Sequence, residues 1–298
     1  QKGEVRVQVQ AIGVNPVDWK MRTSGPLRLA ARLIGPRPPV VVGVDFAGAV
    51  ESVGPGVTRA APGDRVVGGT DFSRGQRGSY ADTVVVREDQ LCRIPDTVDI
   101  AVAAALPVSG VTAQMAVVDL GRIREVPPAQ RRVLVLGASG GVGQLAVQIA
   151  KLEGAFVAGV CSSKNAELVT KLGADLVLDY HQGDVLAQAE PHAPFHIVID
   201  CVGSYSGAGC RALLSARGRH IMVAGDEPKA ALQVLVPPFK SKAILGRPTG
   251  ARLEPLVAAV AAGKLQVSIA AKLPLTSAEE AHRLSRTSRL TGKLILEP

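Results

Sequence analysis

A glycine-rich segment is the part of the chain whose residue types and spacing indicate chemistry most clearly. The run RRVLVLGASGGVGQLAVQIAKLEGA, residues 131–155, has the pattern of a buried strand, a tight turn and an amphipathic helix, in that order. Such a turn lets backbone N–H groups approach a phosphate, and the start of the helix adds a partial positive charge. We therefore predict the pyrophosphate cradle of a dinucleotide-binding βαβ unit.

Three positions of this turn form the dinucleotide fingerprint, and they are occupied by Ala138, Gly140 and Gly143. A missing side chain at Gly140 allows close backbone approach to a ligand, and one at Gly143 allows the helix to pack on the strand. Ala138 departs from the usual first glycine, and a glycine-rich turn in another kind of α/β protein is the alternative. The residues predicted to contact the pyrophosphate are Ala138, Ser139, Gly140, Gly141, Val142 and Gly143.

The type of nucleotide is indicated at the end of the next strand, in AFVAGVCSSKN. NAD-binding proteins usually place a carboxylate about 20 residues beyond the glycine turn, whereas Cys161 and Ser162 stand there. We expect no carboxylate to repel a 2′-phosphate, and Ser162, Ser163 and Lys164 offer hydroxyl donors and a cation. The prediction is NADPH rather than NADH, and the alternative is a serine helix cap followed by a solvated lysine.

Composition excludes several other classes. The 298 residues are 47% hydrophobic and carry a net charge of +8, but only 3% are aromatic, so no base-stacking platform for nucleic acid is expected. No apolar run reaches the length of a membrane-spanning helix. The cysteines form no CxxC pair and no cluster with histidine, so neither a disulfide framework nor a structural zinc site is expected. We predict a cytoplasmic protein, and an organellar location stays open because the chain begins inside a strand pattern.

Hydrophobic periodicity changes along the chain. The first hundred residues alternate with period two and are broken by Gly, Pro and Asp, which indicates a β domain. From Leu106 a helical stretch begins, and strands then alternate with helices, which indicates an α/β fold with a doubly wound parallel sheet. The expected strands are 132–137, 155–161, 175–179, 195–200 and 219–224. A helix near 252–262 and a last strand in TGKLILEP are expected to return and complete the first domain.

Eight segments in order resemble the zinc-independent, quinone oxidoreductase-like branch of the medium-chain dehydrogenase/reductase superfamily. They are AIGVNPVDWK, GVDFAGAVESVGPGV, PGDRV, GSYAD, LPVSGVTA, GASGGVG, KLGADLVLDY and TGKLILEP. The resemblance implies a GroES-like catalytic domain, residues 1–107 completed by 241–298, and a Rossmann NADPH-binding domain, residues 108–240. It also implies that the chain lacks an upstream stretch of about thirty residues.

The resemblance further implies that catalytic zinc is lost, because Asn15 and Val44 stand where zinc-dependent relatives carry Cys and His. Without a Lewis acid, the reducible bond must already be polarised by conjugation. In the loop similar to the family's cleft-lining loop, Asn15, Asp18 and Lys20 are the candidate catalytic residues. Lys20 is a proton donor or substrate-orienting group, or else a solvated lysine, and Asp18 is expected to brace the loop by hydrogen bonding.

Further cofactor contacts follow from the resemblance. Thr112 lies in a segment near the nicotinamide of relatives, although a hydroxyl at a helix start is also an ordinary cap. Tyr180 resembles the tyrosine that completes the 2′-phosphate pocket. Tyr80 has a substrate role or, more simply, a packing role. Four residues follow strands where the nicotinamide ribose passes in relatives, or else form plain tight turns: Cys201, Val202, Gly203 and Gly225.

The function expected from these residues is NADPH-dependent hydride transfer to quinones or to the C=C bond of α,β-unsaturated carbonyls, without metal. The alternative is a non-catalytic binding or structural protein on the same fold that retains NADPH binding, since fold alone does not fix function. The expected partner is a small enone or quinone, with no nucleic acid and no membrane insertion. The resemblance implies a homodimer or a monomer.

Overall fold

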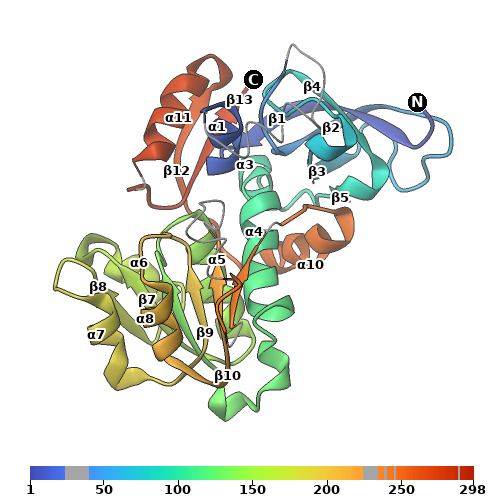
Figure 1. Cartoon of the computed structure of the whole chain (residues 1–298). Helices are drawn as coiled ribbons and strands as arrows, with labels where there is room; N and C mark the ends of the chain where they lie inside the picture. Colours follow the sequence, from blue (N-terminus) through green and yellow to red (C-terminus); the bar gives the residue numbers. More distant parts are fainter. Residues whose placement is uncertain (24–39, 224–233, 238–239, 245, 288) are drawn as a thin grey trace. The chain divides into compact units, whose positions relative to one another are not determined.

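The computed structural model describes residues 1–23, 40–223, 234–237, 240–244, 246–287 and 289–298, which divide into two compact units (Figure 1). Unit 1 comprises residues 1–111 and 247–298, and unit 2 comprises residues 112–246. We expected boundaries after residues 107 and 240. The observed divisions lie slightly later in the chain, and the first falls inside helix α4, Pro107–Gln114.

Unit 1 is built on a seven-stranded sheet with the order β12-β13-β1-β2-β3-β5, in which β4 also pairs with β1. Its long first strand alternates as the sequence predicts: Val5, Val7 and Val9 are buried, and the polar residues between them are exposed. The strands are β1 Glu4–Gly13, β2 Asp45–Val53, β3 Arg65–Gly69, β4 Thr83–Arg87, β5 Leu91–Arg93, β12 Ile269–Pro274 and β13 Lys293–Glu297.

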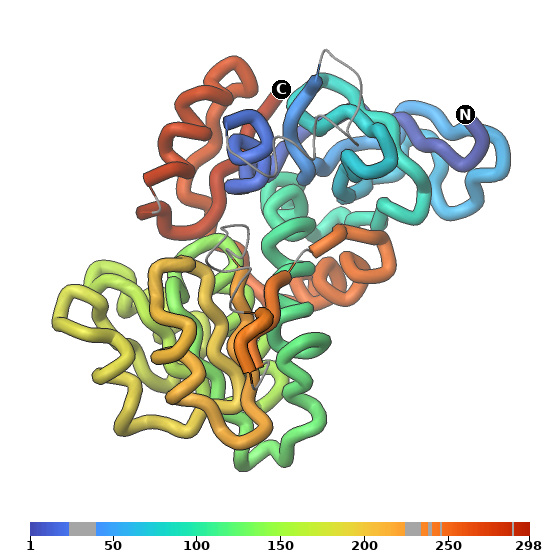
Figure 2. Tube along the Cα trace, in the orientation of Figure 1, coloured from blue at the N-terminus to red at the C-terminus, as the bar shows by residue number. Residues whose placement is uncertain are grey.

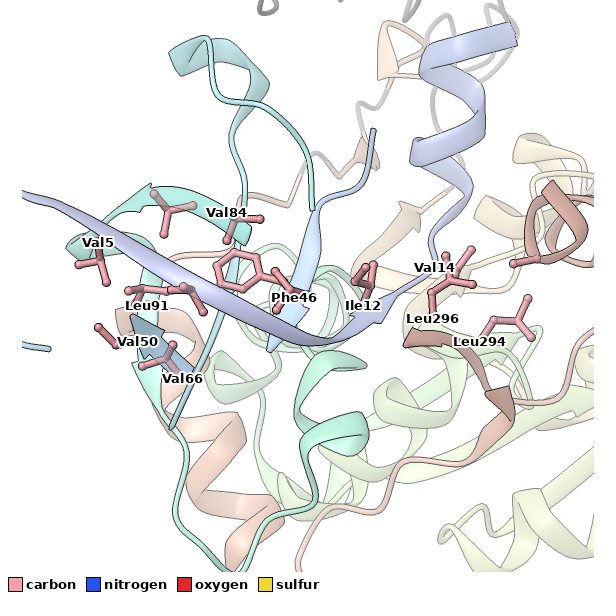
Figure 3. Packing of buried hydrophobic residues seen from close by; sticks show 14 residues of the cluster. Val5, Ile12, Val14, Phe46, Val50, Val66, Val84, Leu91, Leu294 and Leu296 are labelled. Atoms are coloured by element: carbon pink, nitrogen blue, oxygen red, sulfur yellow. The ribbon is translucent and has the colours of Figure 1, made fainter. Parts of the chain in front are cut away.

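The C-terminal strands close this sheet. Strand β13 runs antiparallel to the end of β1, with Ile12 opposite Leu296, and β12 adds in parallel to β13 (Figure 2). The expectation that the tail returns to the first domain is therefore confirmed. Figure 3 shows Phe46 among the buried aliphatic side chains of both segments, with Leu294 and Leu296 beside Val14. Burying this apolar surface holds the two ends of the chain together.

Helices of unit 1 connect and cover these strands: α1 Pro16–Thr23, α3 Ile100–Ala104, the first part of α4, α10 Gly250–Ala261 and α11 Ala278–Arg286. The helix expected near 252–262 corresponds to α10. Helix α1 packs on α11, which lies in the distant C-terminal segment. In the described part of the chain, no helix is long and apolar enough to cross a membrane.

Unit 2 contains a six-stranded parallel sheet with the order β11-β10-β9-β6-β7-β8. The chain starts at the centre with β6, moves outward to β8, and then returns to continue on the other side from β9. This reversal is the switch point at which doubly wound sheets bind ligands. The strands are β6 Arg132–Leu136, β7 Phe156–Cys161, β8 Leu176–Asp179, β9 Phe195–Asp200, β10 Leu214–Met222 and β11 Ser241–Ala243.

The helices between these strands are α5 Gly141–Leu152, α6 Ala166–Lys171, α7 Val185–Ala189 and α8 Gly207–Ala212. All five expected strands are present. The fifth differs, because β10 begins at Leu214, where it pairs with Phe195, and resumes pairing at Arg219 after an irregularity. The polar Ser215 and Arg217, with Gly218 after them, interrupt the apolar pattern and hide this early start from a search for apolar runs.

Candidate functional site

The glycine turn of unit 2 lies between β6 and α5, at the switch point of the sheet. Gly137 takes the left-handed conformation, with φ +81°, and its carbonyl accepts a hydrogen bond from Gly140 N–H at 3.1 Å. Gly140 is the residue before the first turn of α5. A Cβ built on Gly140 meets only the Gly137 carbonyl oxygen, at 3.4 Å. The outer side of the turn is therefore open at the start of a helix, where an anion is stabilised.

Gly143 has the packing role expected of it. A Cβ at this position would overlap the carbonyl oxygen of Gly137 and would lie 2.9 Å from the Cα of Ala138, so the first turn of α5 rests directly on the backbone. The departure at Ala138 also has a physical reason. Ala138 is fully buried and its methyl faces Gly159 of β7, while the positive φ falls on Gly137.

The end of β7 is tied to the glycine turn by a residue that sequence analysis missed. The side chain of Asn165 donates from Nδ2 to Ser139 Oγ at 3.1 Å and to Ser162 Oγ at 3.5 Å. Ser162 is buried, whereas Ser163 and Lys164 are exposed. The Asn165 bridge brings the predicted pyrophosphate segment and the predicted 2′-phosphate segment together at one edge of the sheet.

The expectation that no carboxylate lies near the serines needs correction. Asp179, at the end of β8, accepts hydrogen bonds from Ser163 N–H at 3.1 Å and His181 N–H at 2.9 Å. The dinucleotide fingerprint concerns only the end of the second strand, whereas Asp179 comes from the neighbouring strand. Tyr180 follows it and is 47% exposed, with its ring 4.4 Å from that of His181. The Tyr180 side chain is thus available to a ligand.

The loop after β9 lies against the glycine turn. A Cβ at Gly137 would lie 3.0 Å from Val202 Cγ2 and 3.5 Å from Cys201 Cβ. The loop is shaped by Asp200, whose Oδ1 accepts from Val202 N–H at 2.9 Å and Gly203 N–H at 2.8 Å. Burial raises the pKa of the Asp200 carboxyl, which the two N–H groups partly counteract. Gly203 has φ +84°, so a glycine is required at this tight turn.

For two predicted cofactor-binding residues, Thr112 and Gly225, the described residues show no contact with the glycine turn. Thr112 is buried in α4, and a Cβ at Gly246 would lie 3.0 Å from its hydroxyl oxygen. Among the described contacts, none connects Thr112 with the glycine turn. Gly225 lies outside the described residues.

In unit 1, Asn15 is committed to an internal hydrogen-bond network. Its Nδ2 donates to Gly13 O at 3.2 Å and to Asp45 Oδ2 at 2.9 Å, and its Oδ1 accepts from Lys293 Nζ at 2.6 Å. The residue is only 2% exposed. Because both amide hydrogens and the carbonyl oxygen are used inside the unit, the side chain serves to hold the loop rather than to reach outward.

Asp45 and Lys293 form a buried ion pair that sequence analysis did not identify. Lys293 Nζ lies 3.5 Å from Asp45 Oδ2 and also donates to Val14 O at 3.0 Å, and Asp45 Oδ1 accepts from Val108 N–H at 3.0 Å. Burial raises the pKa of Asp45 and Lys293 opposes this. An aspartate inside the apolar run GVDFAG was the available signal, because a buried charge requires a partner.

Asp18 braces the start of α1, as expected. Its Oδ2 accepts from Asn15 N–H at 2.8 Å, so a carboxylate in the first turn reaches back to the residue that precedes the helix. The same oxygen accepts from Tyr80 O–H at 3.3 Å. Asp18 is fully buried, and burial raises its pKa to about 7. Its other oxygen, Oδ1, is buried without a hydrogen-bond partner among the described residues.

Tyr80 packs against the core of unit 1, which agrees with the packing role considered from the sequence. It also connects two polar side chains, Asp18 and His282, by hydrogen bonds. Its hydroxyl lies 3.1 Å from Nε2 of His282 in α11, and the two ring centroids are 5.5 Å apart. His282 was not singled out from the sequence. Burial lowers the pKa of His282, and Arg22 and Arg286 lower it further.

Lys20 is half-buried, with Nζ 5.7 Å from the ring centroid of Trp19. Trp19 is fixed on α11 by its Nε1 donating to Ser285 Oγ at 3.2 Å, and the guanidinium of Arg286 lies 5.1 Å from the ring. The helix that carries Lys20 is therefore anchored on both sides, by Asp18 and by Trp19. The three predicted catalytic residues thus lie in one six-residue segment, 15–20, and Asn15 and Asp18 face inward.

The comparisons with known proteins agree with this architecture. Residues 1–96 match the family model of the alcohol dehydrogenase GroES-like domain, and residues 172–296 match that of the zinc-binding dehydrogenases. A chloroplast envelope quinone oxidoreductase homolog of Arabidopsis thaliana is 33% identical over 305 residues, covering 100% of this chain and 91% of that protein. The chain belongs to the quinone oxidoreductase-like branch of the medium-chain dehydrogenase/reductase superfamily.

Members of this superfamily are nicotinamide-dependent oxidoreductases, and two further relatives agree with the assignment. The structure of the quinone oxidoreductase from Coxiella burnetii has a TM-score of 0.89 and 28% sequence identity, covering 100% of this chain and 91% of that one. The trans-enoyl reductase mycC of Thermothelomyces thermophilus is 35% identical over 239 residues, covering 73% of this chain and 62% of that protein. The GroES-like and Rossmann folds expected from the sequence are therefore confirmed.

The residues that would hold a catalytic metal in zinc-dependent members can be inspected directly. Val44 offers no donor atom, and the amide of Asn15 is committed to Lys293 and Asp45. In the described ranges, no three His, Cys, Asp or Glu side chains are grouped so that they could hold a metal ion. The donor set at these two positions does not fit zinc.

Proposed function

We propose that this member of the branch is an NADPH-dependent reductase of quinones or of the C=C bond of α,β-unsaturated carbonyls. The observation that carries the proposal is the turn at Gly140, which is open on its outer side and closed to any side chain at Gly143. A nicotinamide cofactor supplies the hydride when bound. The residues proposed to hold it are those of the turn, Ala138, Ser139, Gly140, Gly141, Val142 and Gly143, with Cys201, Val202 and Gly203 of the flanking loop.

The proposed preference for NADPH depends on the end of β7. Ser162, Ser163, Lys164 and Tyr180 lie around the strand ends next to the glycine turn, and a lysine there favours a 2′-phosphate. Asp179 opposes this preference, but both of its oxygens already accept backbone N–H groups, which stabilises its charge locally. We retain Thr112 as a proposed contact to the nicotinamide, and Gly225 as one whose surroundings lie outside the described residues.

The side chains of unit 1 at the positions of the zinc ligands indicate a substrate whose reduction needs no metal. Because Asn15 and Val44 do not fit a zinc ion, the substrate must carry its own polarisation, as an enone or quinone does. Within the catalytic loop, we propose that Lys20 orients the substrate carbonyl and stabilises negative charge on its oxygen. Asn15 and Asp18 are proposed to hold Lys20 in place, since the Asn15 side-chain amide and Asp18 Oδ2 are engaged inside unit 1.

The test is a panel of quinones, enones and saturated alcohols assayed with NADPH and with NADH after dialysis against a strong chelator. Reduction of conjugated substrates with NADPH, unaffected by the chelator, is the expected result. Activity that disappears and returns only with zinc would refute the metal-free mechanism. NADPH binding with no turnover on any substrate would instead favour a non-catalytic binding protein on this fold.

The four cysteines are free, which suits a reducing compartment, so we propose a location in the cytoplasm or inside an organelle. Localisation of a tagged chain by microscopy checks this proposal, and secretion would contradict it.

A further inference from the structure

Three buried or half-buried polar side chains form a chain of hydrogen bonds in unit 1, and the proposed function gives the connection between them no role. Asp18 Oδ2 lies 3.3 Å from the Tyr80 hydroxyl, which in turn lies 3.1 Å from His282 Nε2. Asp18 is fully buried and His282 is 3% exposed, whereas Tyr80 retains some solvent exposure. Of the three, Tyr80 alone is partly exposed on the surface of unit 1.

The two ends of this series of hydrogen bonds, at Asp18 and at His282, each carry a polar atom that has no partner among the described residues. Asp18 Oδ1 and His282 Nδ1 are buried and make no hydrogen bond with the described residues. A polar atom buried without a partner is costly in free energy, so it is rarely retained without a reason. Each end therefore has an unused site for a proton or a hydrogen bond, which a purely structural contact would not need.

Which groups donate and which accept in these two hydrogen bonds depends on where one proton lies. A phenol has a single hydrogen to donate, so Tyr80 can donate to Asp18 or to His282 but not to both. When Asp18 is ionised, Tyr80 donates to it and accepts from His282 Nε2–H. When Asp18 carries a proton, it can donate to Tyr80, and Tyr80 then donates to His282 Nε2. A change in the charge of Asp18 thus reverses both hydrogen bonds.

The charges around these three side chains favour a proton on Asp18 rather than on His282. Burial, together with the like charge of Asp45, raises the pKa of Asp18 to about 7, against the opposing effects of Asn15 N–H, Lys293 and Tyr80. On the other side, Arg22 and Arg286 face His282 and, with burial, disfavour an imidazolium. Burial and the two carboxylates keep Tyr80 a neutral phenol by raising its pKa. The exchangeable proton near neutral pH therefore belongs to Asp18.

We propose that Asp18, Tyr80 and His282 form the proton relay for the protonation step of the reduction, which rests on the proposed function. Once the substrate has accepted hydride, its enolate or hydroquinone anion takes the hydroxyl proton of Tyr80. The O–H bond of Tyr80 breaks as the new C–H or O–H bond forms, and Asp18 returns a proton to the phenolate oxygen. Solvent reprotonates Asp18. His282 positions the Tyr80 hydroxyl, and Lys20 keeps its role on the substrate oxygen.

Turnover of the variants with an enone substrate tests the relay. Tyr80→Phe removes the hydroxyl and leaves the ring packing, so kcat should fall by roughly 10²–10⁴-fold while KM changes little. In the unmodified protein, kcat should decline as pH rises through about 7, because the proton on Asp18 is present below its pKa and lost above it. Asp18→Asn should remove this decline. Tyr205→Phe in unit 2 is the matched control and should retain both kcat and its pH profile.

A measurement on the free protein separates the relay from the reductase activity. In protein labelled with ¹⁵N-histidine, the ring signals of His282, assigned with His282→Gln, should change hydrogen-bonding state with a midpoint near pH 7, and both Asp18→Asn and Tyr80→Phe should abolish the change. A midpoint without any reductase activity would show that the three residues titrate together but would refute the proposed function, and with it the catalytic role of the relay. Reductase activity with no such midpoint, or a pH profile that Lys20→Met alters and Tyr80→Phe does not, would overturn the relay.

Discussion

Replacement of Lys164 by alanine is expected to reduce the efficiency of NADPH while leaving that of NADH nearly unchanged. Lys164 is exposed, so its attraction to a phosphate acts through a medium close to water. Two unit charges about 4 Å apart in water attract by about 1 kcal/mol. A phosphate monoester carries a charge of about −1.5 to −2, which brings the attraction to roughly 1.5–2 kcal/mol. This corresponds to a loss of roughly ten- to thirtyfold.

The assay is steady-state kcat/KM for both cofactors with one enone, at low and at physiological ionic strength. The loss with NADPH should shrink as salt is added, because exposed charges are screened. Lys171→Ala is the matched control, since Lys171 is an exposed lysine in the last turn of α6 in the same unit. Equal losses with NADPH and NADH, or no loss with either, would refute the reasoning that this lysine reads the 2′-phosphate.

Three other substitutions have defined outcomes. Gly143→Ala drives a methyl into the Gly137 carbonyl, so the melting temperature and cofactor binding should both fall, and an unchanged melting curve would contradict the packing described. Lys293→Met leaves the charge of Asp45 buried and unpaired, so urea unfolding should show a loss of about 3–5 kcal/mol, and adding Asp45→Asn should recover part of it. Lys20→Ala should lower kcat by roughly 10²–10³-fold if it stabilises charge on the substrate oxygen, and full activity would assign it to the surface.

The fold was largely predictable from local patterns in the sequence. Strand and helix periodicity located five of the six strands of unit 2 and missed the three-residue β11, and the glycine spacing located the turn between β6 and α5. The closing strand β13 was also predictable, because Leu, Ile and Leu at 294–296 form a short apolar run, as expected of a buried strand. What failed was the start of β10, where Ser215, Arg217 and Gly218 interrupt the apolar pattern of a strand that still pairs in parallel with β9.

The site was predictable only in part, because its polar partners lie far apart in the chain. Asn15 and Lys293 are 278 positions apart, and Tyr80 and His282 are 202 apart. Periodicity describes neighbours within one element and carries no information on such pairs. Asp179 was missed for the same reason, since it reaches Ser163 from an adjacent strand. The contacts of Asn15 with Lys293 and of Tyr80 with His282 exist because the fold buries a charged or polar group that then requires a partner.

The most direct test of the central claim is product analysis of the chelator-treated protein incubated with NADPH and an α,β-unsaturated ketone. We expect the saturated ketone to form, with one NADPH oxidised for each product molecule and no requirement for metal. Formation of the allylic alcohol, a requirement for added zinc, or NADPH oxidation without a reduced product would contradict it.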